Sequence, residues 1–447
     1  MKAKEIVLLI FIIIVGVFFY HAKTGKILFD WNLDEFIGLD LEESTSQESQ
    51  VIEPPFPPAF KVTNAHGDVE IQGTESDKIT ITLLKTAWRR NAEKAKEILD
   101  NLHLIVAKDE RTVTVTTNRN ELESRRRYFG VNRGFETTFR ISVPLNMSVE
   151  VTNSYGLVRV AKVGQTTVRN PHGEIVASEV NGEIQLENSY EDVKLSGLTS
   201  ACQINSGHSS IFVDGVQGEL KIATSYGTVQ LKKAAQKVVV DGSHTEVIGE
   251  DLSGPLDIQN SYEKISLLRV GPTKIEGQHS EIEADDVSGD LEIRDNYESV
   301  HLNNIRGNLN ISGNNLSILG KNVVGEEIYI STSYENVELA DFSGKTKVFQ
   351  SHGDVVLDPL PLTGPIEVHG EYAPITLYWP AGEQYPLEAQ TKNSEIQWRL
   401  PGQITVEEKD SLSVARAFLN LIEKPRIMLT TTYGDILFEP GSPPPSK

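Results

Sequence analysis

The sequence predicts an all-β fold, a β-solenoid (β-helix) of about 16 rungs with 17 to 20 residues in each rung. The first observation is a repeated eight-residue stretch. It reads NSYGLVRV from Asn153, NSYEDVKL from Asn188, TSYGTVQL from Thr224, NSYEKISL from Asn260 and TSYENVEL from Thr332. The second observation is a set of apolar residues at fixed distances from each repeated aromatic residue. The third is the composition, since 34 glycines and 20 prolines suit a chain with many turns.

Two series of residues alternate along the chain. The tyrosines lie 35 to 38 residues apart, and a second series, mostly histidine, lies about midway between them. The first series is Tyr155, Tyr190, Tyr226, Tyr262, Tyr297, Tyr334 and Tyr372, and the second is His172, His208, His244, His279, Asn315 and His352. One rung therefore carries one tyrosine or one histidine, and two rungs make one repeat.

Each rung has apolar residues six and four places before its aromatic residue, and three and five places after it. Around Tyr190 these are Ile184, Leu186, Val193 and Leu195. This alternation is typical of two short half-buried strands on either side of a turn. A single rung cannot bury its own apolar face, so we expect the rungs to stack.

The two series of rungs differ in the size of their core residues. Tyrosine rungs have Leu or Ile six places before the tyrosine. Histidine rungs have Thr166, Cys202, Val238, Thr273 and Thr346 at that place. Alternating large and small layers would fill an interior of constant width. The pattern therefore predicts that Cys202 is a buried core residue rather than a nucleophile.

The same spacing fits His66 and Tyr433, so the solenoid is expected to span residues 60–439, with a disordered tail at 440–447. An insertion at about residues 73–148 interrupts it. Apolar residues at helical spacing predict a helix over Ala87 to Leu102, and RTVTVTT and FETTFRISV read as strands. This helix and these strands would cap one end of the stack, and SLSVARAFLNLIEKP is expected to form a short helix near the other end.

The first 22 residues predict a membrane anchor. Lys2 and Lys4 precede fifteen apolar residues, Ile6 to Tyr20, and no small-x-small cleavage site follows them. A transmembrane helix at residues 1–22 is favoured over a cleaved signal peptide. It would make this a single-pass protein of the cell membrane with the large domain outside the cytoplasm. Residues 23–59, acidic and rich in Ser and Pro, are expected to be a linker.

Charge is distributed unevenly. Residues 85–140 contain thirteen Lys and Arg against eight Asp and Glu, whereas the whole chain has a net charge of −21. One interpretation is a basic patch that meets an anionic envelope surface, and the favoured alternative is an ordinary solvated helix face and loop. The patch would consist of Arg89, Arg90, Arg125, Arg126, Arg127 and Arg133. The acidic balance argues against a nucleic-acid partner.

No catalytic or metal-binding motif was found, so no catalytic residue, metal or cofactor is predicted. In a stack, neighbouring histidines would lie about 9.6 Å apart, too far to share one metal ion. A structural ladder of stacked rings is the favoured interpretation, and a ligand-binding stripe is the alternative. The stripe would consist of Tyr155, His172, Tyr190, His208, Tyr226, His244, Tyr262, His279, Tyr297, Tyr334 and His352.

The opening FKVTNAHGDVEIQG, the inserted helix and strand, and FRISVPLNMSVEVTNSYGLVRV with its serial rungs resemble the bacterial putative-adhesin family, a domain-of-unknown-function family of β-strand repeat proteins. The resemblance covers residues 60 to 438 and implies a β-solenoid fold. It carries over no catalytic or binding residue. The Tyr/His alternation is stricter than the family pattern implies.

Two classes of function fit these observations. The favoured one is a non-enzymatic membrane-anchored envelope protein with a role in adhesion, or as a scaffold or sensor of envelope stress. Its partner would be an envelope glycan or another envelope protein. The alternative is a β-helix enzyme that processes polysaccharides as a lyase or hydrolase, which would need clustered carboxylates in one groove. The repeats do not specify the ligand, the handedness of the coil or the oligomeric state.

Overall fold

The computed structural model describes residues 42–89, 91–124, 134–380, 382–402 and 404–441. Within these residues no helix is long and apolar enough to cross a membrane. The anchor predicted at Ile6 to Tyr20, the first part of the predicted linker and most of the predicted tail lie outside the described residues.

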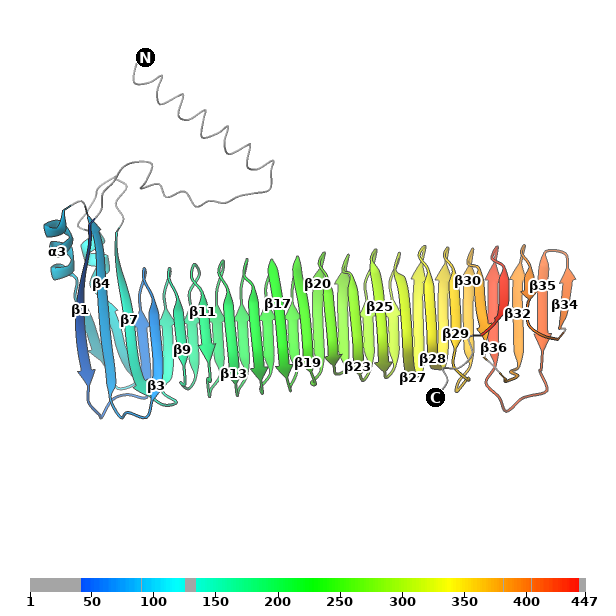
Figure 1. Ribbon diagram of the computed structural model, residues 1–447, viewed down its shortest axis with the longest axis horizontal. Coiled ribbons are helices and arrows are strands. Elements are labelled where there is room, and N and C mark those ends of the chain that lie inside the picture. Colours follow the sequence, from blue (N-terminus) through cyan, green and yellow to red (C-terminus); the bar gives the residue numbers. More distant parts are fainter. Residues whose placement is uncertain (1–41, 90, 125–133, 381, 403, 442–447) are drawn as a thin grey trace, which may run out of the picture.

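The described chain forms a long rod of parallel strands, the predicted β-solenoid (Figure 1). Each turn places one strand on a first wall and the next strand on a second wall. The first wall contains β2 (Ala59–Thr63), β8 (Ser148–Thr152), β10 (Thr166–Arg169), β12 (Ile184–Glu187), β14 (Cys202–Asn205), β16 (Leu220–Ala223), β18 (Val238–Asp241), β20 (Leu256–Ser261), β22 (Thr273–Gln278), β24 (Leu291–Arg294), β26 (Leu309–Ser312) and β30 (Ile366–Glu371).

The second wall faces the first across the core. It contains β3 (Val69–Thr74), β9 (Val158–Ala161), β11 (Ile175–Ser178), β13 (Val193–Leu198), β15 (Ile211–Val216), β17 (Gly227–Ala234), β19 (Thr245–Leu252), β21 (Ile265–Val270), β23 (Ile282–Ser288), β25 (Ser299–Arg306), β29 (Val355–Pro359) and β31 (Ile375–Trp379). Two long strands, β27 (Ser317–Ser333) and β28 (Val337–Ser351), bend around the corner, so their first halves belong to the second wall and their last halves to the first.

The sequence predicted about 16 rungs, and the structure supports a β-solenoid of about 13 turns. The difference lies at the two ends, where strand pairs join out of sequence order. At one end β2 and β3 pair with β8 and β9. At the other end β36 (Ile427–Thr432) and β37 (Ile436–Pro440) follow β30 and β31, and β32 (Leu387–Lys392) and β33 (Ile396–Trp398) lie beyond them.

A cap of antiparallel strands and two short helices closes the N-terminal end. It comprises β1 (Glu42–Ile52), β4 (Ile79–Arg89), α3 (Ala92–Asn101), β5 (Leu104–Lys108), β6 (Thr112–Thr117), α4 (Arg119–Ser124) and β7 (Phe135–Pro144). β6 and β7 confirm the two strands predicted in the insertion. The helix predicted from Ala87 is shorter than expected, because β4 pairs with β7 as far as Ala87 and the side chain of Asn91 caps α3 by accepting from the Glu93 amide.

Residues 42–52 correct the predicted linker. They form β1, which pairs antiparallel with β4 from Glu42↔Arg89 to Ile52↔Ile79. Its Ser, Thr, Glu and Gln side chains suit a solvated edge strand, and charged side chains at an edge hinder pairing with another chain. The polar composition that suggested a linker therefore belongs to an edge strand.

The short helix predicted near the other end is wrong. Residues 412–417 form β35 (Leu412–Ala417), which pairs antiparallel with β32 and with β34 (Thr405–Lys409). The alternation in LSVARA places Val414 and Ala415 on opposite faces of the strand, and Ala415 is buried. Pairing on both sides outweighs the helical propensity of alanine and arginine.

Between the walls lies one continuous hydrophobic core. Cys202 is 3% exposed and lies in register between Ile184 and Leu220 of the neighbouring rungs, so the predicted core position is confirmed. Burial raises the pKa of its thiol to about 12. Cys202 is therefore a small core residue in a layer between two larger ones.

Candidate functional site

The alternating tyrosines and histidines form a ladder of stacked rings along one edge of the rod. Rings stack without interruption from His66 to Tyr297, with centroids 4.7 to 5.7 Å apart and interplanar angles of 4 to 26°. A second stretch continues from Tyr334 through His352 and Tyr372 to Tyr433, with centroids 4.8 to 5.0 Å apart. The structure thus brings together all eleven ladder residues that the sequence singled out, in two stretches.

Asn315 separates the two stretches. It occupies a histidine position, and its backbone has the same left-handed conformation, φ 57°, as His279 with φ 61°. Tyr297 stacks on His279 and Tyr334 stacks on His352, and no ring contact joins these tyrosines to the Asn315 rung within the described residues. One face of each of these two rings is therefore free of a ring partner on that side.

A column of buried polar side chains, two places before most ladder residues, holds the turns in position. The Nδ2 of Asn188 donates to the carbonyl oxygens of Asn170 and Gly173 in the neighbouring rung, at 3.0 and 2.8 Å, and its Oδ1 accepts from the amide of Tyr190 at 3.1 Å. Similar contacts recur elsewhere in the column. Its buried members include Asn64, Asn153, Asn170, Asn188, Thr224, Asn260, Asp295, Thr332, Gln350, Thr391 and Thr431.

These residues were missed as a group by sequence reasoning. In the sequence they appear as a polar residue at a constant position between the apolar strand and the ladder residue. Such residues are common in turns, so the pattern gave no reason to expect that they are buried. Their burial becomes evident only when rungs stack. The amides of Asn153, Asn170 and Asn188 donate to carbonyl oxygens of the preceding rung, so the column helps to fix the height at which each ring lies.

The ladder presents ring edges rather than ring faces to solvent. Its tyrosines are 45 to 61% exposed, yet their faces contact the neighbouring rings. The groups available to a ligand are therefore phenol hydroxyls and imidazole nitrogens in a line, with exposed ring edges between them. Stacking of a sugar on a ring face, as a ligand-binding stripe would suggest, is blocked wherever both neighbouring rings are in place.

The histidines of the ladder are too far apart to bind one metal ion together. Successive histidines are separated by a stacked tyrosine, as in His172, Tyr190 and His208, whose centroids are 5.0 and 5.7 Å apart. Among the described residues, no group of three or more His, Cys, Asp or Glu side chains could hold a metal ion.

Asp295 is the one carboxylate in the buried polar column among the described residues, and it is 1% exposed. Burial raises the pKa of its carboxyl to about 6, although hydrogen bonds from the backbone amides of Asn296 and Ser280 and the charge of His279 favour the ionised form. In the preceding rung Gly277 leaves the space for it, because a Cβ there would lie 2.7 Å from Asp295 Oδ2.

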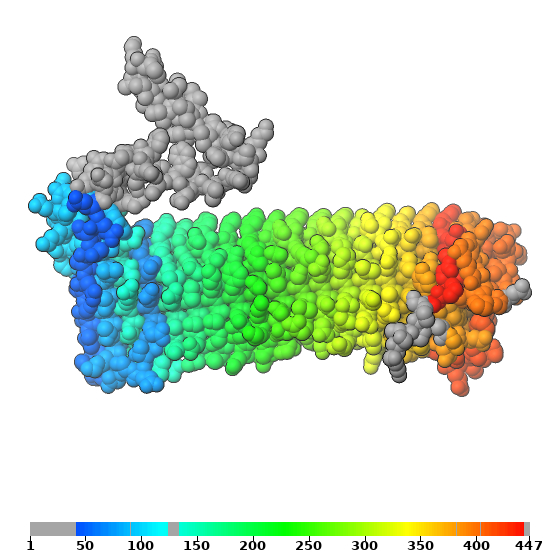
Figure 2. Space-filling view, viewed as in Figure 1, coloured from blue at the N-terminus to red at the C-terminus, as the bar shows by residue number. Residues whose placement is uncertain are grey.

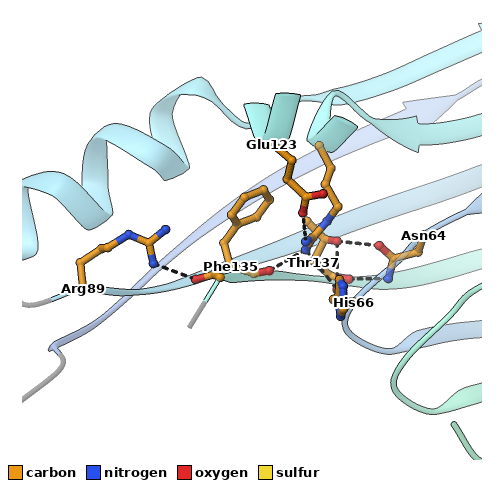
Figure 3. A network of polar contacts seen from close by, with 8 residues as sticks. Asn64, His66, Arg89, Glu123, Phe135 and Thr137 are labelled. Carbon is orange, nitrogen blue, oxygen red and sulfur yellow. Dashed lines mark hydrogen bonds and ion pairs between the residues drawn. The ribbon is translucent and has the colours of Figure 1, made fainter. Parts of the chain in front are cut away.

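The ladder begins at His66, beside the N-terminal cap (Figure 3). The buried Arg119 guanidinium donates to the carbonyl oxygens of Phe135 at 2.6 Å and His66 at 3.4 Å, pairs with Glu123 at 2.9 Å, and lies over the Phe135 ring. Burial, followed by the nearby Arg119 charge, lowers the pKa of His66. Arg119 thus ties α4 to the first rung.

Of the predicted basic patch, the described residues include Arg89 alone, so the patch stays a prediction. Arg89 donates to the carbonyl oxygens of Trp88 and Gly134, which ties it to the cap. The other members, Arg90, Arg125, Arg126, Arg127 and Arg133, lie outside the described residues. Arg119, which the sequence did not single out, is the arginine that contacts the ladder turn.

Comparison with known proteins gives a family and a solved structure that are similar to this chain. No curated protein matches the chain. Among matching solved structures is a putative cell adhesion protein from Clostridium sporogenes ATCC 15579, with 8% identity and a TM-score of 0.19, over 89% of this chain and 99% of that chain. Residues 59–294, more than half of the chain, match the family model Toastrack DUF4097. The chain therefore belongs to the Toastrack DUF4097 family.

Proposed function

We propose that this protein is a non-enzymatic rod anchored in the cell membrane through Ile6 to Tyr20, with its solenoid outside the cytoplasm. The rod carries an adhesive or scaffolding surface away from the membrane, and a sensor of envelope stress is the close variant of this role. The anchor rests on the apolar segment of the sequence, which no small-x-small cleavage site follows.

The observation that carries the proposal is the repetition of the exposed ladder edges. From His66 to Tyr297 a phenol hydroxyl and an imidazole recur with every pair of rungs, about 9.6 Å along the rod, and the ladder tyrosines are about half exposed throughout. A linear ligand with its own repeat could contact several rungs at once, and such multivalent contacts raise avidity without any single strong site. An envelope glycan or an extended envelope protein has this character.

Binding through the ladder edges can be separated from ladder stability. A triple variant with Tyr190→Phe, Tyr226→Phe and Tyr262→Phe keeps the rings, and therefore the stacking, but removes three hydroxyls. We expect retention of purified envelope glycan by the immobilised full-length protein to fall several-fold, with unchanged thermal unfolding. Tyr329→Phe is the matched control, because Tyr329 lies in β27 away from the ladder.

The same experiment tests the non-enzymatic assignment. New reducing ends or unsaturated sugar products, released in step with protein concentration, would contradict it and favour a lyase or hydrolase. Equal glycan retention by the triple variant and the unchanged protein would show that the ladder hydroxyls do not bind the glycan. Membrane fractionation with N-terminal sequencing tests the anchor, and a soluble product that begins after Ala22 would contradict it.

A further inference from the structure

The second wall carries a regular row of apolar side chains on its outer face. One column of outward-facing residues runs in unbroken register from Arg159 to Thr376. Apolar residues occupy every second position of this column, except one that holds Glu283. They are Val176, Phe212, Ile248, Leu319 and Val356.

This row is partly open to solvent. Leu319 is 47% exposed, and the other four are half-buried. Two shallow grooves follow the column, one beside Val176 and Phe212 and the other beside Ile248 and Leu319. Single exposed apolar residues are ordinary, but a periodic row along one face indicates an interaction surface.

The first wall lacks such a row. Its outward residues in the matching rungs are Thr167, Gln203, Val239, Lys274, Asn310 and Lys347, of which only Val239 is apolar. Both walls consist of parallel β-strands, so a preference of strands for apolar residues would act equally on both. Strand propensity therefore does not explain why only the second wall has an outer apolar row. The apolar row is therefore a property of the second wall.

The charges in the same column change sign along the rod. Arg159 and Lys194 lie toward the N-terminal end, whereas Glu283 and Glu338 lie toward the C-terminal end. Two parallel copies placed face to face would set like charges against each other. Two antiparallel copies would set the basic part of each column against the acidic part of the other.

We propose that the outer face of the second wall is the interface of an antiparallel homodimer. Apolar residues recur about every 9.6 Å along the rod, and a second copy of this chain supplies a row with the same period. A two-fold axis at Ser266 places Phe212 opposite Leu319, Val176 opposite Val356, and Lys194 opposite Glu338. Ile248 opposite Glu283 is the unmatched position. This interface is independent of the proposed adhesive role.

The test uses the full-length protein in detergent, with sedimentation velocity over a concentration series. We expect a reversible dimer, with the dissociation constant raised at least about tenfold, or about 1.4 kcal/mol, by Phe212→Glu and by Leu319→Glu. Val239→Glu is the matched control, because it places the same charge at a half-buried outward position of the first wall. Circular dichroism establishes that each variant is folded.

Charge exchange tests the orientation. Lys194→Glu should weaken the dimer, and Lys194→Glu combined with Glu338→Lys should restore it. Carbodiimide should also join Lys194 to Glu338 in the unchanged protein. These residues are about 38 Å apart along one rod, so this cross-link forms only between copies. Cross-links of Lys194 to Glu174 or Asp192, which it contacts within one chain, serve as internal controls.

Three results would overturn the proposal. The first is a protein that stays monomeric at every concentration. This holds also if the second wall binds a glycan or a different protein instead of a second copy of the chain. The second is a dimer that Phe212→Glu and Leu319→Glu leave intact. The third is a dimer that the combined exchange of Lys194 and Glu338 fails to restore, with cross-links joining like ends of the two rods.

Discussion

At the residue scale, the properties of single side chains follow from the layer in which they lie. Cys202 is a core residue because it lies between Ile184 and Leu220, and its thiol is protonated because burial raises its pKa to about 12. Asp295 has a pKa of about 6 because it occupies a buried position that other rungs fill with uncharged residues, Asn, Thr, Ser, Gln or Gly. Residue type alone would have indicated a reactive thiol and an ordinary surface carboxylate.

Core packing at Cys202 should be coupled to the neighbouring layer. Cys202→Leu should overpack it and cost about 1 to 3 kcal/mol, and Leu220→Ala should open a cavity and cost about 2 to 5 kcal/mol. Because the two residues are register partners, the double variant should recover about 0.5 kcal/mol or more of the summed loss. Denaturant unfolding measures all three free energies, with Cys202→Val as a near-neutral control. Strict additivity would show that the two side chains do not share one space.

The ionisation of Asp295 should make stability depend on pH. Its pKa is raised in the folded state, from an ordinary value of 3.8 to about 6, so folding favours its protonated form. The contribution of the Asp295 carboxyl to the free energy of unfolding is fully present below about pH 4. It is lost as the pH rises through about 6. The difference in unfolding free energy between the unchanged protein and Asp295→Asn should therefore change between these values in favour of Asn as the pH rises. A constant difference across that range would mean that Asp295 titrates normally.

At the scale of the element, the unit of stability is the ladder rung with its turn. Every ring between His66 and Tyr297 is stacked on its neighbours, and buried amides such as Asn170 and Asn188, two places before a ring, connect their turns to the preceding turn. A stacked pair contributes about 0.5 to 1.5 kcal/mol beyond the burial of area. The ladder thus adds a small, repeated increment at each rung, and its single break lies at Asn315 among the described residues.

Removing a ring should weaken the rod. Tyr226→Ala loses the stacks on His208 and His244, at 4.8 and 5.1 Å, so the melting temperature should fall. Tyr226→Phe keeps the ring and should unfold near the temperature of the unchanged protein. Thermal unfolding by circular dichroism compares them. Equal stability of Tyr226→Ala, combined with loss of glycan retention, would assign the ring to binding instead of to stability.

Filling the break should strengthen the rod. Asn315→His restores a ring between Tyr297 and Tyr334 on a backbone that already has the conformation of the histidine rungs. We expect the unfolding free energy to rise by about 0.5 to 1.5 kcal/mol. Asn314→His, one place earlier on an exposed side chain, is the control and should not stabilise. A destabilised Asn315→His protein would indicate that the two tyrosine faces need the smaller side chain.

At the scale of the whole molecule, the rod is nearly one-dimensional. Figure 2 shows it as an unbranched column with the N-terminal cap at one end. Each rung contacts mainly the rungs before and after it, so stability is close to a sum of local terms. The layers nevertheless alternate in size and in ring type, which makes two rungs, rather than one, the exchangeable unit.

Deletions should reveal this two-rung unit. Removal of residues 184–219 takes out a tyrosine rung and a histidine rung and joins Glu183 to Leu220, so the alternation is kept. Removal of residues 184–201 takes out one rung and places His172 against His208. We expect a cooperative, soluble rod from the first deletion and a markedly less stable one from the second. Denaturant midpoints measure the difference, and similar midpoints would mean that layer alternation is unimportant.

The sequence by itself determined the repeat, the strands, the ladder and the core position of Cys202. These features could be predicted because neighbouring rungs have the same local sequence pattern. One alignment of the repeats therefore gives the register of all the rungs. The strand pairings at the two ends could not all be predicted in this way. Residues 42–52 look like a linker and residues 412–417 like part of a helix, but each pairs with a strand distant in sequence. The tertiary structure also decided that the polar column is buried, that ring edges rather than faces meet solvent, and that one wall carries an apolar row. Burial and exposure are properties of the stack, because a residue's neighbours above and below lie in other rungs.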